Sequence, residues 1–171
     1  MRGFRETAAG HLITNFSVST VDYSGDPGGL AHISLVRNQG GRRAVTMRSE
    51  DCGRSWHFLS RVNDFGAPAA PLLLADGRVV MIYANRLRPS IRAVVSEDAG
   101  RSWSPEIIVR EDGGSWDIGY PRAWEASPGR IGALYYFNTR DDPVQVKPAA
   151  AGPPWGEGGV RFIARSFFSI D

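Results

Sequence analysis

The chain is a succession of short apolar or alternating runs that are rich in Val, Ile, Phe and Tyr. Nearly every run is bounded by Gly, Pro, Asp or Asn, the residues that favour turns between strands. No stretch keeps an apolar period of 3.6 residues for long enough to predict a helix. The pattern therefore predicts an all-β protein. The predicted strands are residues 12–21, 30–37, 43–48, 56–62, 70–74, 78–84, 91–96, 107–110, 122–125, 131–137 and 160–168. Residues 139–159 contain four Pro and predict a long loop.

An internal repeat organises these runs. The octapeptide SEDCGRSW of residues 49–56 returns as SEDAGRSW in residues 96–103, identical at seven of eight positions and 47 residues further on. A weaker echo pairs residues 76–79 with residues 128–131, and each of these is a Gly turn that leads into an apolar strand. An offset of this size fits a unit of four strands.

The shared pattern Ser-x-Asp-x-Gly-x-Ser-Trp has a physical interpretation as a connection between two strands. The Asp carboxylate can accept hydrogen bonds from backbone N–H groups further along the turn, and Gly can adopt a positive φ. The Trp then begins the next strand with a large apolar ring. We therefore expect Trp56 and Trp103 to be packing residues.

The octapeptides resemble the Asp box, or BNR repeat, of the sialidase (neuraminidase) superfamily. This resemblance implies a β-propeller of sialidase type, of which about three four-stranded blades are present, half of a six-bladed propeller. The whole chain, residues 1–171, is then one partial propeller domain with blades at about residues 8–62, 63–110 and 111–171. Three blades leave an open edge on each side, so we expect either a piece of a longer protein or a homo-oligomer that completes the propeller.

The resemblance extends to candidate site residues. Gly119-Tyr120 before the strand of residues 131–137 is similar to the bacterial sialidase segment in which the Tyr is the catalytic nucleophile. Arg88 stands eight residues before Ser96, and Arg37 stands twelve before Ser49. These spacings are similar to those of two arginines of the clamp that binds the substrate carboxylate, and guanidinium forks suit that group. A neutral Tyr suits a reaction centre next to a carboxylate.

Each of these residues also has an ordinary structural interpretation. Tyr120 could pack its ring at a strand start, Arg88 could be a solvated loop residue, and Arg37 could be an edge residue with an exposed head. Arg86 is the alternative arginine of the same loop. Trp116 and Asp117 lie just before Tyr120 and are candidates for the rim of a site.

The family's acid/base Asp has no counterpart here, and the Glu that activates the Tyr would fall in a region that contains only Asp22 and Asp26 as acids. Two functions therefore stay open. The first is a retaining exo-α-sialidase type of glycoside hydrolase, with an acidic glycan or sialoside as substrate. The second is a non-catalytic Asp-box propeller that binds glycans or mediates assembly. The resemblance implies no cofactor for either.

Composition excludes several other classes. The 20 basic residues are scattered among 18 acidic ones, which argues against a nucleic-acid partner. No apolar run reaches the length of a membrane helix or of a signal peptide, so neither a membrane partner nor a secretory signal is expected. His11, His32 and His57 do not have metal-ligand spacing, and no nucleotide-binding Gly motif is present.

Overall fold

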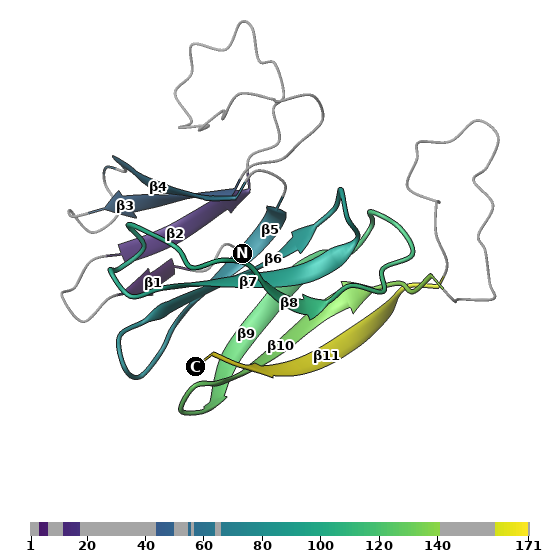
Figure 1. The fold of residues 1–171 in the computed structure, drawn as a ribbon. Coiled ribbons are helices and arrows are strands. Elements are labelled where there is room, and N and C mark those ends of the chain that lie inside the picture. Colours follow the sequence, from purple (N-terminus) through teal and green to yellow (C-terminus); the bar gives the residue numbers. More distant parts are fainter. Residues whose placement is uncertain are drawn as a thin grey trace, which may run out of the picture.

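The structure is a computed structural model that describes residues 4–6, 12–17, 44–49, 55, 57–63, 66–140 and 160–170. These residues form three antiparallel sheets and no helix (Figure 1). The strands are β1 (Phe4–Glu6), β2 (Leu12–Ser17), β3 (Ala44–Ser49), β4 (His57–Asn63), β5 (Gly66–Leu73), β6 (Val79–Asn85), β7 (Ser90–Ser96), β8 (Ile107–Arg110), β9 (Gly119–Ser127), β10 (Arg130–Phe137) and β11 (Phe162–Ser169).

Each sheet is a meander in which consecutive strands pair. The orders are β1-β2-β3-β4, β5-β6-β7-β8 and β9-β10-β11. The first strand of the middle sheet, β5, packs against β9 on one side and against β1, β2 and β3 on the other. The expected all-β partial propeller is therefore confirmed, with three sheets that follow one another along the chain.

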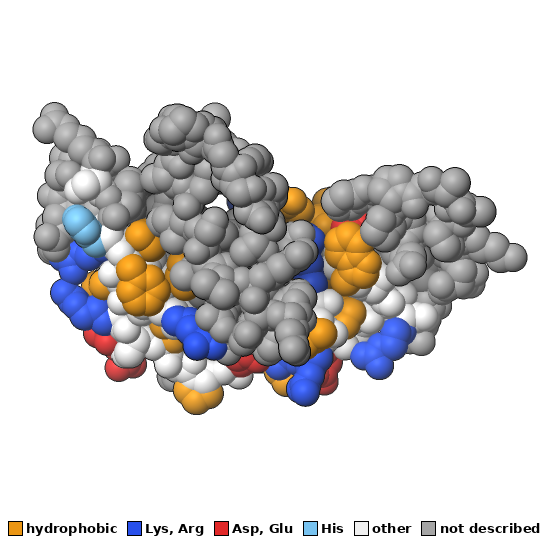
Figure 2. Space-filling view, turned by 90° about the horizontal axis from the view of Figure 1, so that it is seen from above, with side chains coloured by type: hydrophobic (Ala, Val, Ile, Leu, Met, Phe, Trp, Pro, Cys, Tyr) orange, Lys and Arg blue, Asp and Glu red, His pale blue; other side chains and the backbone are white. Residues whose placement is uncertain are grey.

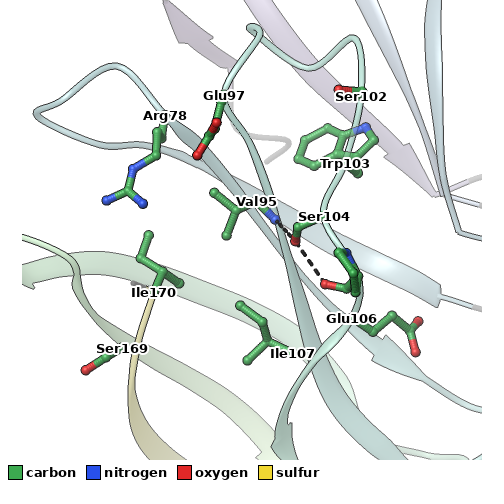
Figure 3. Close-up of a pocket in the computed structure, with 11 residues that line it drawn as sticks. Arg78, Val95, Glu97, Ser102, Trp103, Ser104, Glu106, Ile107, Ser169 and Ile170 are labelled. Carbon is green, nitrogen blue, oxygen red and sulfur yellow. Dashed lines mark hydrogen bonds between the residues drawn. The ribbon is translucent and has the colours of Figure 1, made fainter.

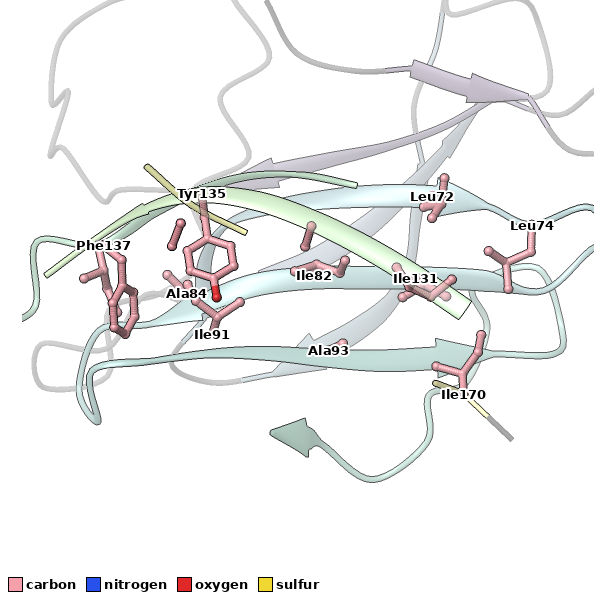
Figure 4. Packing of buried hydrophobic residues seen from close by; sticks show 14 residues of the cluster. Leu72, Leu74, Ile82, Ala84, Ile91, Ala93, Ile131, Tyr135, Phe137 and Ile170 are labelled. Carbon is pink, nitrogen blue, oxygen red and sulfur yellow. The ribbon is translucent and has the colours of Figure 1, made fainter. Parts of the chain in front are cut away.

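Strand β6 explains why the middle sheet holds its neighbours together. All of its residues are buried, although successive side chains point to opposite faces. Val80, Ile82 and Ala84 pack toward the third sheet in one core (Figure 4), whereas Met81 and Tyr83 pack toward the first sheet in another. A strand that is apolar throughout therefore serves two interfaces at once.

The structure corrects several details of the predicted elements. The short strand β1 was not predicted, and β9 begins three residues earlier than the predicted start at Arg122, because Gly119 and Pro121 indicate a turn in the sequence. The third sheet has three strands in the part of the chain that the structure describes, rather than four. The predicted strand at residues 30–37 and most of the predicted loop at residues 139–159 lie outside the described residues.

The connections alternate between two edges of the sheets. The turns β5–β6 and β9–β10 lie at the same edge as the Asp box between β7 and β8. The β6–β7 turn, the β8–β9 linker and the end of β10 lie at the opposite edge, to the right in Figure 1. We call these the box edge and the linker edge.

The second Asp box folds around one carboxylate. Asp98 Oδ1 accepts hydrogen bonds from the backbone N–H of Arg101 at 2.9 Å and of Ser102 at 2.8 Å, and from the Ser96 hydroxyl at 2.8 Å. Ala99 and Gly100 complete the turn with positive φ angles of 59° and 87°. Burial opposes the charge of Asp98, but hydrogen bonds from Ser102, Ser96 and Arg101 outweigh it and lower the pKa of Asp98 to about 2.

The same box joins the middle sheet to the first sheet. The Trp103 indole N–H donates to the Ser60 hydroxyl at 2.9 Å, and that hydroxyl donates to the Gly100 carbonyl at 2.5 Å. The Trp103 ring packs against the core of Met81 and Tyr83. The Asp box therefore stabilises the contact between adjacent blades.

The outer face of the third sheet carries apolar side chains that no described segment covers. Leu134 on β10 and Ile163 and Phe167 on β11 are 40%, 73% and 42% exposed. Trp124 on the neighbouring strand packs edge-on against Phe167, with ring centroids 5.8 Å apart. In a propeller, the corresponding face of a blade packs against the next blade.

We expect Asp98→Asn to lower the free energy of unfolding at pH 7 by about 1 kcal/mol, because the amide cannot accept all of the hydrogen bonds that the carboxylate accepts. The folded-state pKa is depressed, so the stabilisation is present above the unfolded value near 4 and is lost as the pH falls toward 2. Chemical denaturation between pH 2 and 7 should show this loss in the wild type and a flatter profile in Asp98→Asn. Glu97→Gln, an exposed neighbour, is the control, and an identical pH profile in all three proteins would contradict the role of Asp98.

We also expect the chain to self-associate through the outer face of the third sheet, because exposed apolar side chains gain by burial against a second copy. Light scattering after size-exclusion chromatography should give a mass above that of one chain. The double change Leu134→Lys and Ile163→Lys should reduce it to the monomer, and Leu87→Lys, at an exposed apolar residue of the linker edge, should not. A monomeric wild type that unfolds cooperatively would refute this expectation.

Candidate functional site

Tyr120 begins the third sheet in a strained conformation. Gly119 lies opposite Tyr136, and Arg122 lies opposite Leu134, so that Tyr120 and Pro121 together face one residue of β10. This bulge gives Tyr120 a φ of +49°, which costs a bulky residue about 1–2 kcal/mol. The bulge turns the side chain out of the sheet, and Tyr120 is 63% exposed.

Tyr120 belongs to an aromatic cluster with a guanidinium in it. Its ring stacks on that of Tyr136, with centroids 5.7 Å apart and an interplanar angle of 26°. The Arg86 guanidinium carbon, from the β6–β7 turn, lies 5.9 Å from the Tyr120 ring centroid and 5.6 Å from that of Trp116. Side chains from two connections and from two strands, β9 and β10, therefore meet at the linker edge. Seen from above, hydrophobic and basic side chains lie next to one another over much of the described surface (Figure 2).

A chain of hydrogen bonds supports this cluster. Arg86 Nη2 donates to the Tyr136 hydroxyl at 3.4 Å, and that hydroxyl donates to Asp117 Oδ1 at 2.6 Å. Arg161 Nε donates to Asp117 Oδ2 at 2.5 Å. Burial and the bond to Asp117 raise the pKa of Tyr136 above its ordinary value of 10.0, so Tyr136 stays protonated and acts as a donor. The positive charge of Arg161 balances the negative charge of the Asp117 carboxylate.

The β8–β9 linker is held by a buried side chain. Asn138, which is fully buried, accepts a hydrogen bond from the Ser115 N–H at 2.7 Å and donates to the Asp117 carbonyl at 3.0 Å. A Cβ on Gly113 would lie 2.4 Å from the Pro89 carbonyl oxygen, and one on Gly114 would lie 2.4 Å from that of Thr139. Two glycines thus let the linker pass close to its neighbours and present Trp116 and Asp117.

The structure places the residues singled out in the sequence as follows. Tyr120, Trp116 and Asp117 come together in the cluster with Arg86, the alternative arginine. Arg88 does not join them: it is exposed and lines a separate hollow on the same edge. Arg37 lies outside the described residues.

Sequence reasoning missed Tyr136 and Arg161, although a signal for Tyr136 exists. Strand β5 begins with Gly66-Ala67-Pro68 and has the same bulge as Gly119-Tyr120-Pro121, because Gly66 lies opposite Asn85 and Ala69 opposite Tyr83. The middle blade therefore carries Ala67 and Asn85 where the third blade carries Tyr120 and Tyr136. The bulge therefore forms without a tyrosine pair in the middle blade.

The cluster can hold a ligand that has both an apolar face and a negative charge. No ion pair with Arg86 is found among the described residues, and its buried Nε has no hydrogen-bond partner there. Exposed aromatic faces stack on the C–H face of a sugar, and a guanidinium binds a carboxylate or a sulfate.

In the described part of the chain, no group of His, Cys, Asp and Glu side chains could hold a metal ion. Nor do those residues include a helix suited to crossing a membrane.

A larger hollow, of about 700 Å³, lies on the box edge and is lined by Arg78, Glu97, Trp103 and Ile170 among others (Figure 3). The hydroxyl groups of Ser102 and Ser104 and the indole of Trp103 are already engaged within the protein. The Ser104 hydroxyl bonds to Val95 and Pro105, and that of Ser102 bonds to Asp98. We therefore assign this hollow to the structure of the box and not to a ligand.

Solved structures share this fold over most of the chain. A protein of unknown function from Dyadobacter fermentans has a TM-score of 0.62 and 26% identity, and the match covers 99% of this chain and 38% of that protein. A polysaccharide lyase of family PL25, an ulvan lyase, has a TM-score of 0.63 and 14% identity over 98% of this chain and 38% of its own. The GH93 α-L-arabinofuranosidase of Fusarium graminearum has a TM-score of 0.52 and 15% identity over 78% of this chain and 39% of its own.

The chain thus spans less than two fifths of the length of each of these proteins. No curated protein matches the sequence. The family described as BNR repeat-like domain matches residues 25–133, which include the first Asp box, the second Asp box, Arg86 and Tyr120. This match covers more than half of the sequence, and the chain therefore belongs to the BNR repeat-like domain family.

Proposed function

We propose that the chain is part of a carbohydrate-binding propeller and that its linker edge binds an acidic saccharide. Arg86 binds the negative group of the sugar, and Tyr120 and Trp116 contact its apolar face. Tyr136, Asp117 and Arg161 hold these groups in position from behind.

The observation that carries this proposal is the environment of the Arg86 guanidinium and the partners it has within the protein. Its guanidinium lies among aromatic rings, makes one hydrogen bond to Tyr136 and has no carboxylate partner among the described residues. Removing a charge from water without an opposite charge is costly, so a ligand anion at this place would be favourable. A carboxylate or a sulfate on a sugar supplies such an anion and also an apolar ring face.

Two further facts support a saccharide. Tyr120 keeps an exposed ring in a strained backbone conformation at a position where the preceding blade has Ala67. Among the similar structures, the PL25 ulvan lyase has been solved bound to -[GlcA(1-4)Rha3S]-, and the GH93 enzyme with arabinobiose. Both of these structures share the fold and have saccharides as ligands.

We expect Arg86→Gln to weaken the binding of a glucuronate-bearing oligosaccharide about ten-fold, because a charge-assisted hydrogen bond is lost. Tyr120→Ala should weaken it about five-fold through loss of stacking. Isothermal titration calorimetry measures both, with Arg101→Gln on the box edge as the control. The carboxyl-reduced oligosaccharide should bind weakly and without dependence on Arg86. Equal affinity of wild type and Arg86→Gln for the acidic sugar would refute the site.

Hydrolysis of a sialoside is a second candidate function, and the strain and exposure of Tyr120 favour it. Residues in rare backbone conformations are often found at active sites. In this mechanism the Tyr120 oxygen bonds to the anomeric carbon as the bond to the leaving oxygen breaks, and the tyrosine proton passes by way of a base to that oxygen. Water then cleaves the glycosyl–tyrosine bond, gives its hydroxyl to the sugar and returns a proton to the tyrosine oxygen. The carboxylate that belongs to the cluster is that of Asp117, which accepts hydrogen bonds from Tyr136 and Arg161.

Hydrolysis of a fluorogenic sialoside tests this second candidate. If Tyr120 is the nucleophile, Tyr120→Phe should lower turnover by about a thousand-fold, because the attacking oxygen is removed. Arg101→Gln should leave turnover unchanged. Activity that survives Tyr120→Phe would remove this residue from the mechanism, and no activity in the wild type would favour the binding function alone.

A further inference from the structure

A second hollow lies on the linker edge, next to the cluster of Tyr120. It has a volume of about 470 Å³, and its lining includes three arginines from three different segments. Arg88 comes from the β6–β7 turn, Arg92 from β7 and Arg140 from the segment after β10. The one acidic residue in this lining is Glu111.

The charges of the hollow are only partly balanced. Arg92 Nη1 lies 3.5 Å from Glu106 Oε2. The other oxygen of this carboxylate accepts a hydrogen bond from the Tyr83 hydroxyl at 2.6 Å. Arg140 Nη2 donates to the Glu111 backbone carbonyl at 2.7 Å, which carries no net charge. No ion pair of Arg88 is found among the described residues. The hollow therefore has an excess of positive charge.

The arginines are held by the local structure. Asn85 Oδ1 accepts hydrogen bonds from the backbone N–H groups of Leu87 and Arg88 at 3.1 and 3.0 Å, which defines the turn that carries Arg88. The Ser90 hydroxyl donates to the Arg88 carbonyl at 2.6 Å and accepts from Arg92 Nε at 3.0 Å. These bonds fix the backbone of the turn that carries Arg88 and the guanidinium of Arg92 before any ligand arrives, which lowers the entropy cost of binding.

The hollow and the Tyr120 cluster share the β8–β9 linker. Gly113 and Gly114 line the hollow, and Trp116 belongs to the cluster. Only Ser115 lies between Gly114 and Trp116 along the chain, so the Cα atoms of these two residues are at most about 7 Å apart. A single saccharide chain can therefore reach both places.

Building on the proposed function, we infer that this hollow is a second anion subsite, which binds a carboxylate or sulfate on a sugar next to the one held by Arg86. Arg88 and Arg140 contact that group, and the positive charge of Arg92 adds to the electrostatic attraction for it. The ligand of the linker edge is then a polysaccharide with negative groups on neighbouring units, and not a glycan with a single acidic end.

The test compares Arg88→Gln/Arg140→Gln with Arg101→Gln/Arg130→Gln, which removes the same charge from the box edge. Calorimetric titrations use four probes: methyl glucuronide, tetragalacturonate, a sulfated carrageenan tetrasaccharide and neutral maltotetraose. We expect the first variant to bind at least one of the two multiply charged probes about ten-fold more weakly, and to lose part of the salt dependence of this binding. Its affinity for methyl glucuronide should not change. The two multiply charged probes distinguish a carboxylate from a sulfate.

Each result decides one point. Equal affinities of the two variants for both multiply charged probes would overturn the second subsite and leave the Arg86 site to be judged by Arg86→Gln. If Arg88→Gln/Arg140→Gln weakens the binding of an acidic probe and Arg86→Gln does not, the result would support the subsite and overturn the proposed function. No binding of any acidic probe to the wild type would overturn both. Thermal unfolding of every variant shows that a loss of binding is not a loss of fold.

Discussion

The burial of β6 on both faces is the constraint on which the rest of the structure depends. Side chains of a strand alternate between faces, so Ile82 and Tyr83 pack into different cores although they are adjacent in sequence. The middle sheet must therefore lie between two others, and burying each such side chain contributes about 1.5–3 kcal/mol. The β6–β7 turn, which carries Arg86 and Arg88, continues directly from this buried strand.

The hydrogen bonds that join neighbouring blades and the proposed ligand site lie at opposite edges of the stacked sheets. On the box edge, the hydrogen bonds of Asp98 hold the turn together, and those of Ser60 with Trp103 and Gly100 join neighbouring blades. On the linker edge, positive charge and aromatic surface are left over after the internal bonds are made. The strain of Tyr120 also lies there, and it is sustained by the sheet pairing on either side of the bulge.

Much of the fold could be predicted because each strand is a local pattern. Alternating or continuous apolar runs predicted β6, β7, β8 and β10 to within one residue at each end. The three residues of β1 are too few to show a pattern. The start of β9 was missed because Gly119 and Pro121 favour turns, and only the pairing with β10 shows that they form a bulge.

The candidate site could be predicted in part. Tyr120 was recognised from its sequence context, and Trp116 and Asp117 from their closeness to it along the chain. Spacing alone could not choose between Arg86 and Arg88, because within one tight turn two arginines two residues apart can point to different places. Arg161 is far from Tyr120 in sequence, and only the pairing of β10 with β11 brings its end of the chain to the cluster.

The sequence by itself determined the repeated four-stranded unit, the Asp-box turns and the all-β class, since these depend on residues close together in the chain. The tertiary structure alone decided which side chains from separate turns share one surface. The reason is physical: the position of a guanidinium or a ring at the linker edge depends on how three sheets pack, and that packing is a sum of many contacts between distant segments.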